Sequence, residues 1–204
     1  MTRDEEKEII GAVLSGDKDA YEKLVLEYHK SVYNIALRMT GSPEDACDIA
    51  QDVFFKAYRS LRHFRGSASF GSWIYRVASN MSIDHLRRQK RQHTAETVYL
   101  DDSREGERPA EIPDVSGEPY GELEKKEIRK AVCEGLDMLP EEQKLILVLR
   151  EVNGLSYAEI AQTLKIELST VKSRLYRARA HLADCLLKKG NFFESYSSNK
   201  RKGG

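Results

Sequence analysis

The sequence predicts an all-α protein of two small helical domains joined by an acidic flexible linker, with a helix-turn-helix in the second domain. Three observations predict this class. Apolar residues recur at helical spacing in nearly every patterned segment. Residues 93–122 hold three of the five prolines, with two Lys or Arg against nine Asp or Glu. Residues 154–182 read as two short helices around a tight turn, and the second helix is strongly basic.

Length and charge set the domain boundaries. The 204 residues suffice for one or two domains, and the net charge of the whole chain is zero. Residues 1–92 carry a net charge of +2, residues 93–122 carry −7 and residues 123–204 carry +5. We therefore expect a first domain over 1–92, a linker over 93–122, a second domain over 123–188 and a disordered tail over 189–204.

The cysteines and the N-terminus predict a cytoplasmic protein. Cys47, Cys133 and Cys185 are odd in number and lack CxxC spacing, which argues against a disulfide framework or a zinc site. Their redox role stays open. The charged N-terminus is unlike a signal peptide, and the longest aliphatic run, residues 145–149, is too short to cross a membrane.

The first domain divides into helices at recognisable breaks. Helices are expected over residues 4–14 and 18–39, and the second has an apolar face of Leu24, Tyr28, Val32, Ile35 and Met39. Gly41 ends it, and Ser42 followed by Pro43 starts the next helix, which continues to about Leu61. After a Gly/Ser loop at 66–69, a further helix is expected over about 70–91.

The second domain leads into the helix-turn-helix. Helices are expected from about Leu123 to Met138 and over 141–152, separated by Pro140. Ser156 and Glu159 form a capping box for the first helix of the motif, and Ile166 lies in its turn. Ser169 or Thr170 is expected to cap the second helix, whose buried stripe steps by four, three and four residues: Val171, Leu175, Ala178 and Leu182.

The second helix of this motif has the chemistry of a DNA-binding helix. Lys172, Arg174, Arg177 and Arg179 supply four positive charges and no negative one lies among them. A basic face backed by an apolar stripe suits phosphate neutralisation and contacts to base edges. The alternative is a solvated basic helix on a bundle. The capping box, the small Ala161 and the basic helix occur together, which favours DNA binding.

Two segments of the first domain present polar faces. Asp48, Gln51, Asp52 and Phe55 lie opposite the apolar stripe of their helix, and the sequence leaves open whether this face is solvated or docks a basic partner. In the next helix Arg76, Asn80, Asp84, Arg87 and Arg91 share one face. Aromatic residues cluster at its start: Phe64, Phe70, Trp73 and Tyr75. Aromatics beside a Gly/Ser loop and a basic helix suit unstacked bases, although a core position is the simpler reading for the Trp73 ring.

Four stretches in the same order resemble the extracytoplasmic-function sigma factors of bacterial RNA polymerase. These stretches are DACDIAQDVFFKAYRSL, FGSWIYRVASNMSIDHLRRQKR, LPEEQKLILVLREVNGLSYAEIA and STVKSRLYRARAHL, and the resemblance covers about residues 18–188. The chain departs from the family in its turn, where Lys165 and Ser169 stand in place of frequent glycines and Glu167 in place of a frequent proline. A left-handed non-glycine residue costs on the order of 1 kcal/mol.

The resemblance implies a function and a set of site residues. The chain would bind core RNA polymerase and promoter DNA, melt the promoter at initiation, and bind a cognate anti-sigma factor. It would use no metal or cofactor. The core-polymerase contact would use Asp48, Gln51, Asp52 and Phe55. The −10 element would meet Phe64, Phe70, Trp73, Arg76, Asn80, Arg87 and Arg88, and the loop 64–71 would hold a flipped base. The −35 element would meet Ser169, Thr170, Lys172, Ser173, Arg174, Tyr176 and Arg177. The acidic linker would approach the RNA path.

Two other classes of function fit the sequence less well. A response regulator needs alternating strands and helices with a phosphorylatable Asp at a strand end, and none is evident. An enzyme is disfavoured because the chain has no HExxH, CxxC, P-loop, GxSxG or dinucleotide fingerprint.

Overall fold

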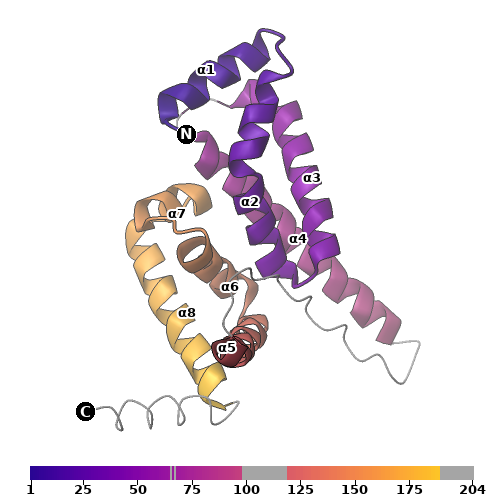
Figure 1. The fold of residues 1–204 in the computed structure, drawn as a ribbon, viewed down its shortest axis with the longest axis vertical. Coiled ribbons are helices and arrows are strands. Elements are labelled where there is room, and N and C mark those ends of the chain that lie inside the picture. Colours follow the sequence, from indigo (N-terminus) through magenta and orange to yellow (C-terminus); the bar gives the residue numbers. More distant parts are fainter. Residues whose placement is uncertain (65, 67, 98–118, 189–204) are drawn as a thin grey trace.

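The computed structural model describes residues 1–188 except 65, 67 and 98–118, and these described residues form an all-α fold. Most of the expected linker and the whole expected tail therefore lie outside the described residues. Figure 1 shows the helices. In chain order they are α1 (Arg3–Leu14), α2 (Ala20–Thr40), α3 (Pro43–Ser60), the 3-10 turn η1 (Leu61–His63), α4 (Phe70–Thr97), α5 (Pro119–Asp137), α6 (Glu141–Leu147), the π-helical turn η2 (Val148–Val152), α7 (Tyr157–Leu164) and α8 (Leu168–Lys188).

Helices α2, α3 and α4 form the N-terminal half, with α1 lying across the end of α2 (Figure 1). The apolar face expected for α2 is buried throughout, and Leu24, Val32, Ile35 and Met39 are fully inaccessible. A buried side chain of this size contributes about 1.5–3 kcal/mol. Gly41 ends α2 in the left-handed conformation at φ 76°, and the Ser42 hydroxyl accepts a hydrogen bond from Asp45 N in the first turn of α3. The predicted end of α2 and the predicted cap of α3 are therefore confirmed.

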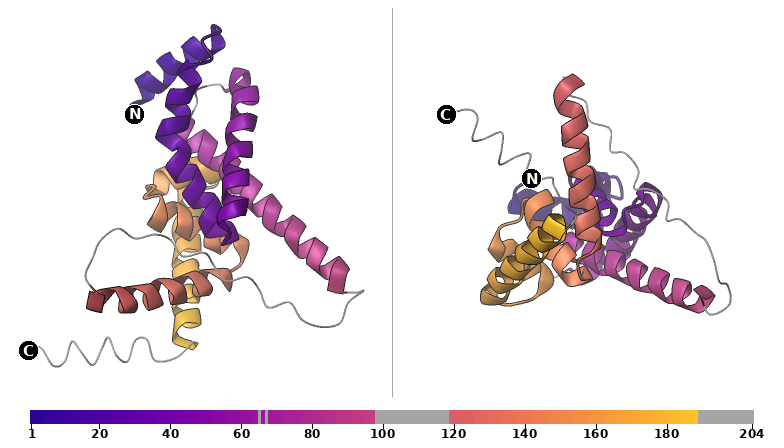
Figure 2. Two further views of the ribbon diagram at one scale, coloured as in Figure 1. Left: turned by 45° about the vertical axis from the view of Figure 1, so that its right-hand side comes forward. Right: turned by 90° about the horizontal axis from the view of Figure 1, so that it is seen from below.

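Helix α4 is longer than expected. The sequence places its end near Arg91, whereas the helix continues to Thr97. The nearest proline, Pro109, lies well beyond this point, and residues 92–97 include no helix breaker. Figure 2 shows the extra turns projecting from the body of the molecule.

Helices α5 to α8 form the C-terminal half. Helix α6 packs on α8, and α5 crosses α8 at Gly135, where an added Cβ would lie 3.0 Å from Leu182 Cδ1. Val171, Leu175 and Ala178 are buried and Leu182 is half-buried, which confirms the predicted stripe of α8. The helix expected over 141–152 is interrupted, because residues 148–152 adopt the wider π geometry. No pattern in these residues signals that change.

The helix-turn-helix forms with one correction. Ser156 and Glu159 make both bonds of the predicted capping box, at 3.2 Å and 2.7 Å. Lys165 ends α7 in the left-handed conformation at φ 55°. Ser169 and Thr170 do not cap α8, contrary to expectation. The helix begins at Leu168 and Val171 N donates to Glu167 O, so both hydroxyl residues lie inside the first turn.

The two halves pack against each other, a feature that the sequence did not predict. Helix α7 contacts α4, and both α6 and η2 contact α2. The buried Lys144 ammonium donates to Met39 O at 2.7 Å and to Asp137 Oδ1 at 2.6 Å. Met39 belongs to the last turn of α2, whose carbonyls lack intrahelical partners and attract a cation. Asn153 Nδ2 makes a second bridge to Ser31 O at 3.0 Å.

Candidate polymerase and nucleic-acid interfaces

The outer face of α3 is acidic and exposed. Asp48, Gln51, Asp52 and Phe55 all reach solvent, while Ile49, Val53 and Ala57 on the opposite side are buried. The Phe55 ring is 60% exposed, which is unusual for phenylalanine, and the Arg59 guanidinium lies 5.5 Å from its centroid. The face therefore combines negative charge with an accessible aromatic ring, a combination suited to a basic protein partner.

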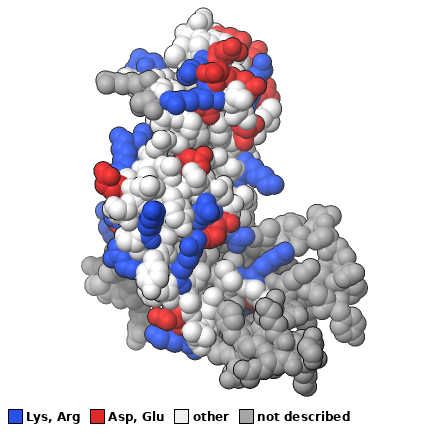
Figure 3. Space-filling model, turned by 90° about the vertical axis from the view of Figure 1, so that its left-hand side faces the viewer, with Lys and Arg blue, Asp and Glu red and all other residues white. Residues whose placement is uncertain are grey.

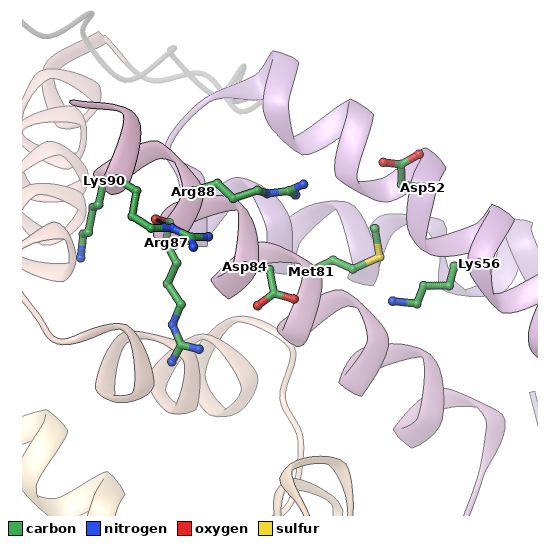
Figure 4. Close-up of a pocket in the computed structure, with 8 residues that line it drawn as sticks. Asp52, Lys56, Met81, Asp84, Arg87, Arg88 and Lys90 are labelled. Carbon is green, nitrogen blue, oxygen red and sulfur yellow. Dashed lines mark hydrogen bonds between the residues drawn. The ribbon is translucent and has the colours of Figure 1, made fainter. Parts of the chain in front are cut away.

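A groove of about 800 Å³ separates α3 from α4. Its lining includes Asp52 and Lys56 of α3 and Met81, Asp84, Arg87 and Arg88 of α4 (Figure 4). The structure thus brings Asp52, expected at the polymerase contact, to the same groove as Arg87 and Arg88, expected at the −10 element. Arg88 and Arg87 are both exposed. The groove could accommodate a backbone phosphate near these guanidinium groups.

One carboxylate of the C-terminal half reaches the basic end of this groove. Glu141 Oε1 lies 2.8 Å from Lys90 Nζ, and Glu141 Oε2 lies 3.4 Å from Arg87 Nε. The hydrogen bond from Lys90 and the charges of Lys90 and Arg87 hold the pKa of Glu141 below its usual value. Arg87 points toward the C-terminal half in Figure 4. When the two halves are packed together in this way (the docked arrangement), the Glu141 carboxylate therefore pairs with Arg87, a cation that the sequence predicts to face DNA.

Aromatic rings gather around the start of α4. Phe70 lies 6.0 Å from Phe64, 5.5 Å from Trp73 and 5.5 Å from Tyr28, measured between ring centroids. Phe64 and Trp73 are half-buried, whereas Phe70 is fully buried. The expectation that Phe70 touches DNA directly is therefore not supported by this arrangement, because its ring packs inside the cluster. Phe64 and Trp73 retain accessible surface.

A smaller pocket of about 210 Å³ opens beside the same loop. Its walls come from four parts of the chain: the N-terminus with α1, α2, the start of α4, and the region around the start of α7, where Leu155 precedes the helix and Glu159 lies in its first turn. Arg76 and Asn80 do not line this pocket. They stand one turn apart farther along α4, with Arg76 half-buried and Asn80 exposed.

Glu6 is a residue of this pocket that sequence reasoning missed. Its side chain is only 4% exposed, although α1 lies at the surface. A signal was present, because Glu6 occupies the same helical stripe as the buried Ile10 and Val13. An acidic residue within an apolar stripe indicates a buried carboxylate with specific partners.

Helix α8 presents a polar outer face. Ser169, Lys172, Ser173, Tyr176 and Arg177 are exposed, Thr170 and Arg174 are half-buried, and the Tyr176 ring is 76% exposed. In Figure 3, Lys and Arg side chains gather over the middle of the side on which α7 and α8 lie.

Two of the four basic side chains predicted for α8 form ion pairs within the protein. Arg174 pairs with Glu142 at 3.1 Å and Arg179 pairs with Glu151 at 2.6 Å. The hydrogen bond that Arg179 donates to Glu151 raises the pKa of Arg179 above its usual value. Lys172 and Arg177 make no ion pair with any residue in the described part of the chain, and these two cations are available to an external polyanion.

Two kinds of feature are absent from the described residues. No helix among them is long and apolar enough to cross a membrane. No cluster of three His, Cys, Asp or Glu side chains within residues 1–188, leaving out the undescribed positions, is arranged to hold a metal ion.

Comparison with known proteins gives consistent matches over both halves. Residues 24–92 match the Sigma-70 region 2 family and residues 130–182 match the Sigma-70, region 4 family. The chain is 34% identical over 179 residues to the RNA polymerase sigma-H factor of Pseudomonas aeruginosa, covering 88% of this chain and 92% of that protein. It is 34% identical over 171 residues to the ECF RNA polymerase sigma-E factor of Escherichia coli K12, covering 84% and 88%.

Solved structures share the fold at lower sequence identity. CnrH in complex with the cytosolic domain of CnrY has a TM-score of 0.64 and 21% identity, and the match covers 91% of this chain and 99% of that one. The sigma factor RpoE in complex with the anti-sigma factor NepR, from Bartonella quintana, has a TM-score of 0.59 and 20% identity, covering 84% and 98%.

Proposed function

Because the chain belongs to the extracytoplasmic-function sigma factors of the sigma-70 family, we propose that it binds core RNA polymerase and directs it to promoters defined by −10 and −35 elements. It acts as a specificity subunit, and polymerase supplies the catalytic site. The observation that carries this proposal is the exposed face of α8, with unpaired Lys172 and Arg177 over a buried stripe. That face has the charge and shape of a major-groove reading helix.

The two halves divide this work in our proposal. Residues 1–92 bind core polymerase through the acidic face of α3 and read the melted −10 element through α4 and the loop before it. Residues 123–188 bind the −35 element through α8, with the acidic segment between them passing toward the RNA path. The face of α3 supports the first assignment, since Asp48, Gln51, Asp52 and Phe55 are all exposed. The −10 surface in this proposal includes Arg76, Asn80, Arg87 and Arg88 of α4.

The docked halves must separate on a promoter. Elements at −10 and −35 lie about 25 base pairs apart, which is about 85 Å along B-DNA. Helices α4 and α7 touch in the docked arrangement, so the two reading surfaces cannot span that distance. Residues 98–118 have a contour length of about 70 Å, enough to permit wide separation.

An anti-sigma factor is the second partner in the proposal. Two solved structures with the same fold are complexes, one with the cytosolic domain of CnrY and one with the anti-sigma factor NepR. We propose that a cognate inhibitor of this kind binds the present chain in the cytoplasm.

The function is tested by transcription with purified core polymerase. The chain should co-elute with core in equal amounts and should produce run-off transcripts from a subset of a promoter library. A stand-alone regulator or an enzyme would do neither. Failure to co-elute, with a correctly folded chain, would contradict the proposal.

A further inference from the structure

Helix α1 places one buried carboxylate against the start of α4. Glu6 Oε2 accepts a hydrogen bond from Phe70 N at 2.9 Å, and Glu6 Oε1 accepts one from Gly71 N at 3.4 Å. The Tyr28 hydroxyl also donates to Glu6 Oε1. Glu6 lies before residues 24–92, the segment that matches Sigma-70 region 2.

These bonds meet a specific need of α4. The first N–H groups of a helix have no intrahelical partners, and buried ones must find acceptors elsewhere. The Ser69 hydroxyl accepts from Ser72 N at 3.1 Å and serves one of them. Glu6 serves the two before it, and its charge lies at the positive end of the helix dipole. Burial and the bond to Glu6 raise the pKa of Tyr28, so its hydroxyl remains a donor.

The same contacts fix the surroundings of the loop. Tyr28 packs so closely on Gly71 that an added Cβ would lie 3.0 Å from Tyr28 Cε1. Phe70 is held among Phe64, Trp73 and Tyr28, so a shift of its backbone would move the whole aromatic cluster. Arg3 of α1 makes a second tie, because its Nη2 donates to Gly66 O in the loop at 2.8 Å.

We propose that Glu6 is a positioning residue for −10 recognition: it fixes the start of α4 and, through Phe70, the neighbouring rings of Phe64 and Trp73, and thereby sets base preference in the melted −10 element. This inference rests on the proposed function, because it assigns a role within the −10 surface. Glu6 itself touches no DNA. It acts through Phe70, Gly71 and the small pocket that they border.

The test compares Glu6→Gln with two matched controls. Glutamine keeps the size of the side chain but replaces one acceptor oxygen by a donor, which leaves a buried N–H of α4 without a partner. Discrimination between the cognate −10 element and single-base variants, measured by run-off transcription, should fall roughly tenfold. Co-elution with core and −35 duplex binding should stay at wild-type values.

The controls separate positioning from loss of α1. Glu5→Ala removes the side-chain acceptor of the exposed capping box of α1, in which Glu5 Oε2 accepts from Thr2 N at 2.7 Å, and leaves Glu6 in place. Tyr28→Phe removes only the hydroxyl donor and keeps both backbone bonds. Both controls should retain wild-type −10 discrimination. Equal loss in Glu5→Ala would assign the effect to the stability of α1 and overturn the inference.

A direct readout is the fluorescence of 2-aminopurine placed within the −10 element of the open complex. Glu6→Gln should change its intensity, because the base environment changes, whereas a purely structural role would lower only the melting temperature. If Glu6→Gln does not fold, the same measurements are made on Arg3→Ala, which removes the hydrogen bond from Arg3 to Gly66 O in the loop. Wild-type discrimination in the folded Glu6→Gln, or in Arg3→Ala if that variant is needed, would overturn the inference. Absence of promoter-specific transcripts with the wild-type chain would instead refute the proposed function.

Discussion

At the scale of single residues, the proposed DNA-reading surfaces depend on the basic side chains that form no ion pair within the described part of the chain. Arg174 and Arg179 look equivalent to Arg177 in sequence, yet Glu142 and Glu151 hold the first two. The partners come from α6 and η2, so the distinction arises only when these segments pack beside α8. The same reasoning applies to Arg87, which is basic in sequence but paired with Glu141 in the docked arrangement.

Asp52→Arg should abolish binding to core polymerase while leaving the fold intact. Asp52 is exposed on α3, so the exchange adds no buried charge, but it turns attraction to a basic partner into like-charge repulsion. Co-elution with core and circular dichroism provide the measurement. Asp184→Arg makes the same change of charge on exposed α8 and should bind core normally. Unchanged core affinity in a helical Asp52→Arg protein would contradict the assignment of this face.

Asn80→Ala should lower open-complex formation and relax sequence preference in the −10 element. Asn80 is exposed on α4 and its amide can pair with a base edge, whereas alanine cannot. Permanganate footprinting and transcription from −10 variants measure the effect, with −35 binding unaffected. Gln89→Ala, another exposed amide on α4, is the control. Footprints matching wild type would remove Asn80 from the −10 surface.

At the scale of elements, α8 acts as a unit whose buried stripe fixes which side chains face outward. Val171 and Leu175 are essentially inaccessible, so the exposed positions between them cannot rotate away. The turn before α8 is equally constrained, because Lys165 adopts φ 55°. Both the outward face of α8 and the turn that leads into it are therefore fixed by the fold.

Arg177→Ala should cost roughly 1–3 kcal/mol in binding to a −35 duplex and relax specificity at one position. Base reading is favoured because Lys172 already supplies charge for the backbone. Titrations against single-base variants over a salt series provide the measurement. Arg179→Ala is the matched control, since that guanidinium is held by Glu151 at 2.6 Å. Uniform weakening with a salt slope lower by about 1 would indicate a phosphate contact instead.

Lys165→Gly should stabilise the C-terminal half by up to about 1 kcal/mol. Glycine adopts the left-handed conformation without the steric cost of a Cβ, although its greater freedom in the unfolded chain offsets part of this gain. Denaturant unfolding measures the change. Lys172→Gly, placed within the first turns of α8, should destabilise and serves as the opposite control. A lower free energy of unfolding in Lys165→Gly would show that the lysine side chain stabilises the turn.

At the scale of the whole molecule, we expect packing of the two halves against each other to compete with promoter binding. Lys144 bridges them through Met39 O, and Glu141 pairs with Lys90 and Arg87. Because the pKa of Glu141 is lowered, its contribution to docking is present at neutral pH and is lost as pH falls through that lowered value. In the proposed function, DNA phosphates would compete for the same cations.

Glu141→Gln should therefore shift the molecule toward the separated state. Dyes at the exposed positions Glu44 and Asp184 report the distance between α3 and α8 by energy transfer. Transfer should fall when promoter DNA and core are added to the wild-type chain, and it should start lower in Glu141→Gln. Glu127→Gln, at an exposed position on α5, makes the same change of charge and is the control. Constant transfer on promoter binding would contradict the need for separation.

The sequence by itself determined the order of the helices, the caps of α3 and α7, and the exposed faces of α3 and α8, because these follow from local patterns. Helical periodicity separates the buried stripe of α8 from Lys172 and Arg177, and Ser156 with Glu159 specifies the start of α7 within four residues. Only the tertiary structure decided the burial of Phe70, the link from Glu6 to the start of α4, and the docking of Lys144 on Met39. These contacts join residues 64 and 105 positions apart. No local pattern records such distances, because the partners are chosen by the packing of whole helices.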